Sequence, residues 1–261
     1  MMHSPLAVIH SDAKIGNNVT IDPFAVIEKD VIIGDNCRIY SHATILDGSR
    51  IGSDCKVFPG AVIAGIPQDL KFAGEESIVE IGDRTTIREC VTVNRGTASK
   101  GKTVVGNDCL IMAYAHIAHD CVIKDHVIIA NASQLAGEVV VDNFAIVSGG
   151  SLVHQFTRIS KHVMIQGGSR VGKDIPPYTL IGRDPIAYCG INIVGLRRRG
   201  FTNDQIFLIQ DIYRTLYTRG LNNTEALNAI ETEYEPSIER DLILNFIKTS
   251  ERGIVRGSID N

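Results

Sequence analysis

Branched aliphatic residues recur at every sixth position along most of this chain. The series runs from Ile9 to Ile63, returns at Ile81, and continues unbroken from Val105 to Val171. An α-helix has about 3.6 residues per turn and cannot keep every sixth residue on one face. The period therefore predicts short strands joined by turns, with the large aliphatic side chains filling an interior.

A second series supports this interpretation. The residue four positions after each aliphatic is small or β-branched, and four of the six cysteines belong to this series: Cys37, Cys55, Cys109 and Cys121. We interpret these cysteines as small core residues. Gly, Asn and Asp cluster after the aliphatic, as in IGNN, IGDN and VGND, and they tolerate left-handed turn geometry. Three hexads then form one triangular coil of about 18 residues, and stacked coils pair as parallel strands.

Two stretches break the period and are expected to form loops outside the coil, at residues 64–80 and 94–104. Long loops on a rigid scaffold are often functional, although both could also be tolerated insertions.

The repeat is expected to end near KDIPPY (173–178). Thr202 and Gln205 fit a helix capping box, and Gly220 fits a helix C-terminal cap. Two further helices are expected at 224–233 and 238–249. We therefore predict a mainly β fold, with a parallel β-helix over residues 1–189 and a helical domain over residues 190–261 that caps its end.

Composition limits the classes of function. The 261 residues carry a formal net charge of −4, which gives no reason to expect nucleic acid as a partner. No apolar run approaches the length of a membrane span, and the N-terminus lacks a signal-peptide pattern. We expect a cytoplasmic protein without disulfides. Its six cysteines contain no C-x-x-C pair, so their spacing does not indicate a metal site.

The segment Ala115–Asp120, AHIAHD, carries the clearest candidate chemistry. His119 occupies neither interior series, and Asp120 follows it directly. The 18-residue coil places Gly137 over His119 and Gln155 over Gly137. A histidine base beside an exposed backbone N–H suits acyl transfer by direct attack of an alcohol. A solvated surface histidine is the competing interpretation.

Other positions on the wall are more ambiguous. Met164 and the pair Gly167–Gly168 lie about one coil beyond His154, where glycines could leave a groove for an acyl chain or merely form turns. The run Arg197–Arg199 could bind a diphosphate or could be a solvated basic run.

The residues quoted so far, with several further motifs, resemble those of the UDP-N-acetylglucosamine 3-O-acyltransferase family, which catalyses the first step of lipid A synthesis. The resemblance covers nearly the whole chain and rests on IPQDLKFAGE (66–75), IGDRTTIRECVTVNRGT (81–97), AHIAHD (115–120), LAGEV (135–139), VHQF (153–156), DIPPY (174–178) and GINIVGLRRRGF (190–201).

The resemblance implies a left-handed β-helix, although right-handed crossovers are the general preference. It also implies a homotrimer with active sites between subunits, and transfer of a 3-hydroxyacyl chain from acyl carrier protein to the glucosamine 3-hydroxyl. No resident cofactor or metal is implied, since 4′-phosphopantetheine arrives on the carrier protein.

The resemblance also assigns roles. His119 matches the general base, Asp120 the acid that orients it, and Gly137 the oxyanion donor. Gly167 matches the position that limits acyl length, so glycine predicts a long chain, and Met164 lies in the same groove. The matched substrate-binding positions are Gln68, Asp69, Lys71, His116, His154, Gln155, Asn192, Arg198 and Arg199.

Three positions depart from the family pattern: Asn94 stands where some members have histidine, Glu138 replaces another histidine, and Val194 replaces an acid near the nucleotide. These departures concern secondary contacts and leave the assignment of His119 intact.

The sequence has three alternative interpretations. A γ-type carbonic anhydrase needs three histidines around zinc; His116 and His119 could supply two. A sister acyltransferase of the same pathway carries an extra N-terminal domain, for which hexads beginning at Ile9 leave no room. A purely structural β-helix fits the repeat but not the two loops.

Overall fold

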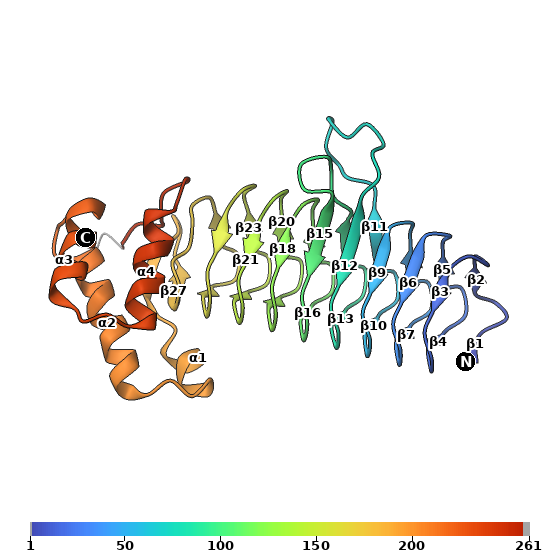
Figure 1. Ribbon diagram of the computed structural model, residues 1–261, viewed down its shortest axis with the longest axis horizontal. Coiled ribbons are helices and arrows are strands. Elements are labelled where there is room, and N and C mark those ends of the chain that lie inside the picture. The colour runs from blue at the N-terminus through green and yellow to red at the C-terminus, as the bar shows by residue number, and fades with distance from the viewer. Residues whose placement is uncertain (1, 258–261) are drawn as a thin grey trace.

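The computed structural model describes residues 2–257, which form a long parallel β-helix followed by a helical region (Figure 1). The core is the predicted aliphatic series: Ile27, Ile45, Ile63 and their equivalents are almost completely buried. Each short strand pairs with the strand one coil away, as in Val26 opposite Thr44 and His116 opposite Gln134, both 18 residues apart. The predicted coil length is confirmed.

Within the described residues the strands form three sheets, one for each wall of the triangular coil. The first wall contains β1 (Met2–His3), β4 (Thr20–Ile21), β7 (Arg38–Ile39), β10 (Lys56–Val57), β13 (Thr86–Ile87), β16 (Leu110–Ile111), β19 (Ile128–Ile129), β22 (Ile146–Val147), β25 (Met164–Ile165), β27 (Thr179–Gly182) and β28 (Ala187–Ile191). The second contains β2 (Val8–Ile9), β5 (Val26–Ile27), β8 (Thr44–Ile45), β11 (Val62–Gly65), β14 (Thr92–Asn94), β17 (His116–Ile117), β20 (Gln134–Leu135), β23 (Leu152–Val153) and β26 (Arg170–Val171). The third contains β3 (Lys14–Ile15), β6 (Val31–Ile33), β9 (Ser49–Ile51), β12 (Ile78–Ile81), β15 (Lys102–Val105), β18 (Val122–Ile123), β21 (Val140–Val141) and β24 (Arg158–Ile159).

The turns between walls contain a residue in the left-handed region of backbone space. Asn18 and Asn36 adopt it, as the sequence predicts, with φ near +54° and +59°. Bulky Tyr114 and Phe144 adopt it as well, at +62° and +61°. The turn geometry is therefore imposed by the closing coil and does not require Gly, Asn or Asp at every turn.

The four cysteines of the small series are buried, as predicted, and their thiols lie against backbone carbonyls. Burial raises the pKa of Cys109 to about 11 and that of Cys121 to about 12, so both remain neutral thiols that contribute packing.

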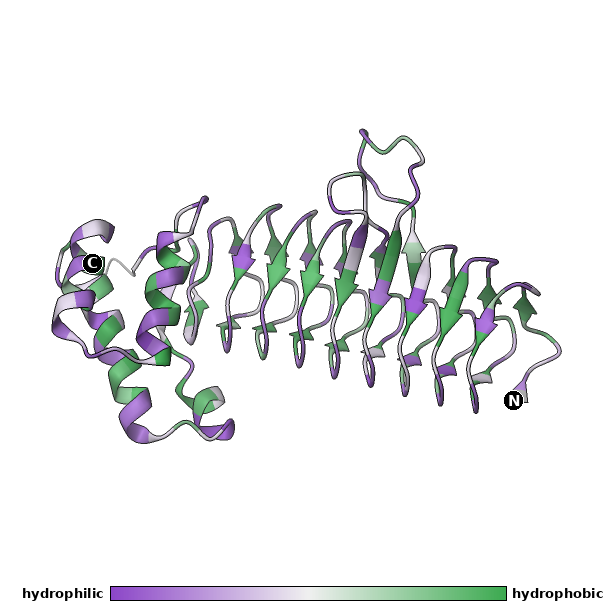
Figure 2. Cartoon of the chain, viewed as in Figure 1, coloured by the Kyte–Doolittle hydropathy of each residue, from purple (hydrophilic) through white to green (hydrophobic). Residues whose placement is uncertain are grey.

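Both interruptions of the period are loops that project side by side from one edge of the β-helix (Figure 1). They are shorter than predicted, because β11 extends to Gly65 and β12 begins at Ile78, while β15 begins at Lys102. The segments outside the strands are residues 66–77, called the long loop below, and 95–101, called the short loop. Figure 2 shows hydrophobic strands recurring along the coil, with hydrophilic ones among them, and helices that carry both hydrophobic and hydrophilic stretches.

The C-terminal region contains α1 (Ile193–Arg198), α2 (Asn203–Thr218), α3 (Asn223–Glu233) and α4 (Ile238–Lys248). The predicted capping box at Thr202 and Gln205 is present. Helix α1 and the antiparallel pairing of β27 with β28 were not predicted. The chain then returns to the β-helix, where Val255 joins its core. No helix among the described residues is long and apolar enough to cross a membrane.

Candidate active site

His119 lies in the turn after β17 and faces the next coil. The backbone N–H of Glu138 donates to the carbonyl of His119 at 3.0 Å, and that of Phe156 donates to the carbonyl of Gly137 at 3.1 Å. These two hydrogen bonds hold the turns that contain His119, Gly137 and Phe156 one above the other. The stacking of Gly137 over His119, and of the following turn over Gly137, is therefore present as the coil arithmetic predicts.

His119 forms a pair with Asp120. Its Nδ1 lies 2.8 Å from Oδ2 of Asp120, whose side chain is completely buried, while 19% of the His119 side chain is exposed. A buried carboxylate accepts the proton of Nδ1 and thereby leaves Nε2 as the basic nitrogen. Nε2 faces the opening, where Asp69 of the long loop lies 4.0 Å away.

Asp120 is fixed by the short loop. Its carboxylate accepts hydrogen bonds from the backbone N–H of Thr97 at 3.0 Å, from the Thr97 hydroxyl at 2.6 Å and from the backbone N–H of Lys100 at 3.2 Å. Burial alone would raise the pKa of Asp120, but the hydrogen bonds from Thr97 and His119 outweigh it and hold the pKa below its usual value. Asp120 therefore stays ionised beside the histidine.

Gly137 has no room for a side chain. A Cβ atom at this position would lie 2.6 Å from both Cε1 and Nε2 of His119. The glycine thus lets the backbone approach the imidazole closely, which places a peptide unit beside the basic nitrogen.

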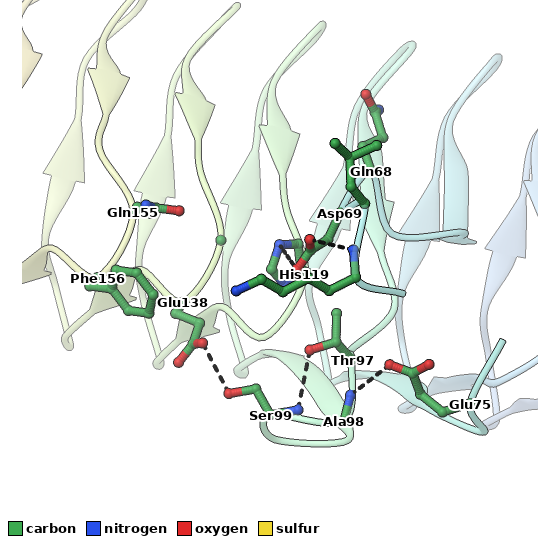
Figure 3. A pocket seen from close by; sticks show the side chains of 13 residues that line it. Gln68, Asp69, Glu75, Thr97, Ala98, Ser99, His119, Glu138, Gln155 and Phe156 are labelled. Carbon is green, nitrogen blue, oxygen red and sulfur yellow. Dashed lines mark hydrogen bonds and ion pairs between the residues drawn. The ribbon is translucent and has the colours of Figure 1, made fainter. Parts of the chain in front are cut away.

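These groups border a hollow of about 770 Å³ between the two loops and the β-helix wall (Figure 3). Six predicted site residues line it: Gln68, Asp69, Lys71, His119, Gly137 and Gln155. The remaining lining residues are Leu70, Glu75, Thr97, Ala98, Ser99, Glu138 and Phe156.

His116 and His154 border a different hollow, of about 500 Å³, on the adjoining wall with Leu135 and Leu152. Nδ1 of His116 lies 2.7 Å from the hydroxyl of Thr92. Burial and the neighbouring His119 both lower the pKa of His116, which favours its neutral form. The sequence expectation placed His154 and Gln155 together. In the structure they border separate hollows, because His154 directly follows β23 on the second wall while Gln155 already lies in the turn that leaves it.

The remaining predicted positions lie outside both hollows. Asn192 is buried and caps α1, with its side chain bonded to Gly195 N and to the carbonyl of His162. Arg199 donates to the carbonyl of Phe144, and Arg198 is exposed on α1. Met164 lies on β25 of the first wall and Gly167 in the turn after it, and both residues are exposed.

Two of the three departures from the family pattern touch the loops. Asn94 is buried and donates to the carbonyl of Ile66 at the start of the long loop. Glu138 accepts a hydrogen bond from Ser99 and pairs with Lys100 in the short loop. The side chain of Val194 is exposed on α1.

Sequence reasoning missed Thr97, Ser99 and Glu75. No periodicity predicts the path of a loop, so the contacts of these three residues with the wall and with the other loop could not be placed. The signals present were the place of Thr97 in the NRGT segment, directly after the strand that ends at Asn94, and the place of Glu75 at the end of IPQDLKFAGE. Among residues 2–257, no three His, Cys, Asp or Glu side chains are grouped to hold a metal ion.

Comparison with known proteins decides the family. Residues 174–255 match the model described as UDP N-acetylglucosamine O-acyltransferase, domain 2, and residues 12–47 and 102–137 match bacterial transferase hexapeptide repeats. An acyl-[acyl-carrier-protein]–UDP-N-acetylglucosamine O-acyltransferase of Chlorobaculum parvum is 58% identical over 250 residues, which cover 95% of each chain. The chain belongs to this acyltransferase family.

Solved structures agree with the assignment to the UDP-N-acetylglucosamine O-acyltransferase family. A UDP-N-acetylglucosamine acyltransferase from Bacteroides fragilis superposes with a TM-score of 0.96 at 56% identity, covering 97% of this chain and 99% of that one. The enzyme from Francisella novicida gives a TM-score of 0.95 at 42% identity, covering 99% and 95%. The left-handed β-helix with a C-terminal helical region, expected from the resemblance, is confirmed as the fold.

Proposed function

We propose that this chain transfers an (R)-3-hydroxyacyl group from acyl carrier protein to the glucosamine 3-hydroxyl of UDP-N-acetylglucosamine, within lipid A biosynthesis. Relatives whose matches cover 95% or more of this chain are named for an acyl-[acyl-carrier-protein] donor and for UDP-N-acetylglucosamine as acceptor. The structural observation that carries the proposal is the His119–Asp120 pair, whose Nε2 faces a hollow large enough for a sugar and a thioester.

The proposed reaction is a direct attack. Nε2 of His119 removes the proton of the sugar 3-hydroxyl while its oxygen forms a bond to the thioester carbonyl carbon. The N–H of Gly137 stabilises the oxyanion that develops on the carbonyl oxygen. The carbon–sulfur bond then breaks, and the protonated histidine returns its proton to the departing thiolate of 4′-phosphopantetheine. Asp120 stays ionised and stabilises the imidazolium formed in between.

Direct attack is favoured over an acyl-enzyme by the hydroxyl groups in the hollow. Thr97 donates to Asp120, and Ser99 donates to Glu138. Both hydroxyls are therefore bonded to carboxylates, whereas an activated nucleophile would be bonded to the histidine.

The proposal extends to assembly and binding. A homotrimer would bring the face with His116 and His154 against a neighbouring subunit, and would let Asn192, Arg198 and Arg199 serve a nucleotide bound there. Gln68, Asp69, Lys71 and Gln155 would contact the sugar, its diphosphate or the thioester. The exposed Gly167 beside Met164 would leave space for a long acyl chain.

Intact-mass measurement tests the direct attack. The protein is incubated with 3-hydroxyacyl carrier protein alone, and UDP-N-acetylglucosamine is then added. We expect no acylated protein in the first step and acylated sugar nucleotide in the second. Accumulation of a protein species heavier by one acyl group, consumed when the sugar nucleotide arrives, would contradict direct attack.

A further inference from the structure

The short loop is fastened to the wall of the β-helix by one carboxylate beyond Asp120. Glu138 follows Gly137 in the turn stacked above His119. Its Oε1 accepts a hydrogen bond from the Ser99 hydroxyl at 2.9 Å, and its Oε2 lies 3.4 Å from Nζ of Lys100. Figure 3 shows the Glu138 carboxylate pointing down at the tip of this loop.

The residues that Glu138 holds are next to those that hold the catalytic pair. Ser99 donates its backbone N–H to the Thr97 hydroxyl, and that hydroxyl donates to Asp120. Lys100 also reaches Asp120 twice, through its backbone N–H to the carboxylate and through Nζ to the carbonyl at 3.2 Å. Any displacement of Ser99 or Lys100 is therefore transmitted to the donors of Asp120.

The other side of the short loop is held as well. Glu75 of the long loop accepts from the backbone N–H of Ala98 at 2.8 Å and from that of Ala73 at 2.8 Å. The short loop thus lies between two carboxylates, Glu75 on one side and Glu138 on the other, with Asp120 beneath it. The tip of the loop, from Ala98 to Lys100, is exposed, so burial contributes little to holding it in place.

We propose that Glu138 is a positioning residue: it fastens the short loop through Ser99 and Lys100, and so keeps Thr97 on Asp120 and the imidazole of His119 oriented. The contacts that hold the short loop do not depend on the proposed function. The predicted effect on turnover rests on it. The proposal also explains one departure from the family pattern. A carboxylate at position 138 has a lysine partner at position 100 of the same chain.

The competing role for Glu138 is a direct contact with the substrate, because its side chain borders the hollow. A double-mutant cycle separates the two. Glu138→Gln keeps an acceptor for Ser99 but removes the charge that pairs with Lys100, and Lys100→Met removes the same pair from the other side.

In the full-length protein, we expect Glu138→Gln to lower kcat about threefold, the size expected of a partly exposed ion pair, with each KM within about twofold. In the Lys100→Met background, the same change should leave kcat unchanged. An equal loss in both backgrounds, or a loss confined to KM, would overturn the proposal in favour of direct substrate contact.

Hydrogen–deuterium exchange tests the loop without reference to activity. We expect Glu138→Gln to speed exchange of the backbone amides in residues 95–101 about threefold. Unchanged exchange there would overturn the proposal. If the unmodified protein acylated no sugar nucleotide at all, the proposed function would fail, and the exchange result would still decide whether Glu138 fastens the loop.

The matched control is the ion pair between Lys124 and Asp142 on the same β-helix. Its atoms lie 3.2 Å apart, and its side chains are 45% and 18% exposed, compared with 36% and 20% for Lys100 and Glu138. Lys124→Met should leave both kcat and exchange of the short loop unchanged. A threefold loss with this variant would show that any such ion pair has the same effect, and would overturn a special role for Glu138.

Discussion

At the scale of single residues, the candidate site depends on a buried charge. Asp120 is completely buried, yet hydrogen bonds from Thr97, Lys100 and His119 surround its carboxylate. A buried carboxylate that lost these donors would be strongly destabilised. The same donors fix the direction of the carboxylate. The stability of the buried charge and the orientation of the His119 imidazole therefore have the same cause.

Replacing Asp120 with asparagine tests both consequences. Asparagine tolerates the positive φ of this position, +60°, so the backbone should be kept. An amide can donate to Nδ1 and favour the wrong tautomer, and we expect kcat to fall about 100-fold or more. A variant with near-normal kcat would show that the carboxylate does not orient the base.

The stability effect should depend on pH. Because the folded pKa of Asp120 is lowered, its contribution to stability is fully present above the unfolded value near 3.9 and is lost as pH falls through the folded pKa. Urea unfolding should therefore show a deficit of about 1–3 kcal/mol for Asp120→Asn at pH 6 that shrinks below about pH 4. A deficit that stays constant down to pH 3 would contradict this.

At the scale of elements, the repeat and the positions of the two loops could be predicted, whereas the path of each loop could not. A strict period fixes which side chains face inward, so Ile117 and Ile129 were placed in the core, and Gly137 over His119, by counting alone. The donors of Asp120 come from a segment without periodicity, whose path depends on tertiary contacts. The six-residue helix α1 was missed for a related reason, since it is too short to show a helical period.

The capping box of α2 offers a test at this scale. The Thr202 hydroxyl accepts from Gln205 N at 3.2 Å, and the Gln205 side chain accepts from Thr202 N at 2.9 Å. Thr202→Ala removes one of these bonds, and chemical unfolding should show a loss of about 1 kcal/mol. Turnover at 25 °C should be unchanged, because Thr202 lines neither hollow and is not among the proposed substrate-binding residues. Unaltered stability would show that the cap contributes nothing.

At the scale of the whole molecule, the predicted site residues of a single chain do not come together in one site. His119 lines one hollow, His116 and His154 line another, and Arg198 lies on the helical region. Leu152 beside the second hollow and Tyr114 are large apolar side chains that are 49% and 65% exposed. Association of several copies would cover such side chains and bring the separated residues together.

Light scattering coupled to size-exclusion chromatography measures that association. A homotrimer of 28.4-kDa chains has a mass of about 85 kDa. We expect this mass to persist at the concentrations used for activity measurements. A mass of one chain together with full activity would contradict a site completed between subunits.

His119 is the proposed base for acyl transfer to UDP-N-acetylglucosamine. The most direct measurement follows acylated sugar nucleotide formed from a series of 3-hydroxyacyl carrier proteins, with the unmodified protein and with His119→Ala. We expect product with the unmodified protein, formed fastest with long chains. We expect kcat of His119→Ala to be about 100- to 10,000-fold lower while the variant remains folded. Near-normal turnover by His119→Ala, or no product with any chain length, would contradict it.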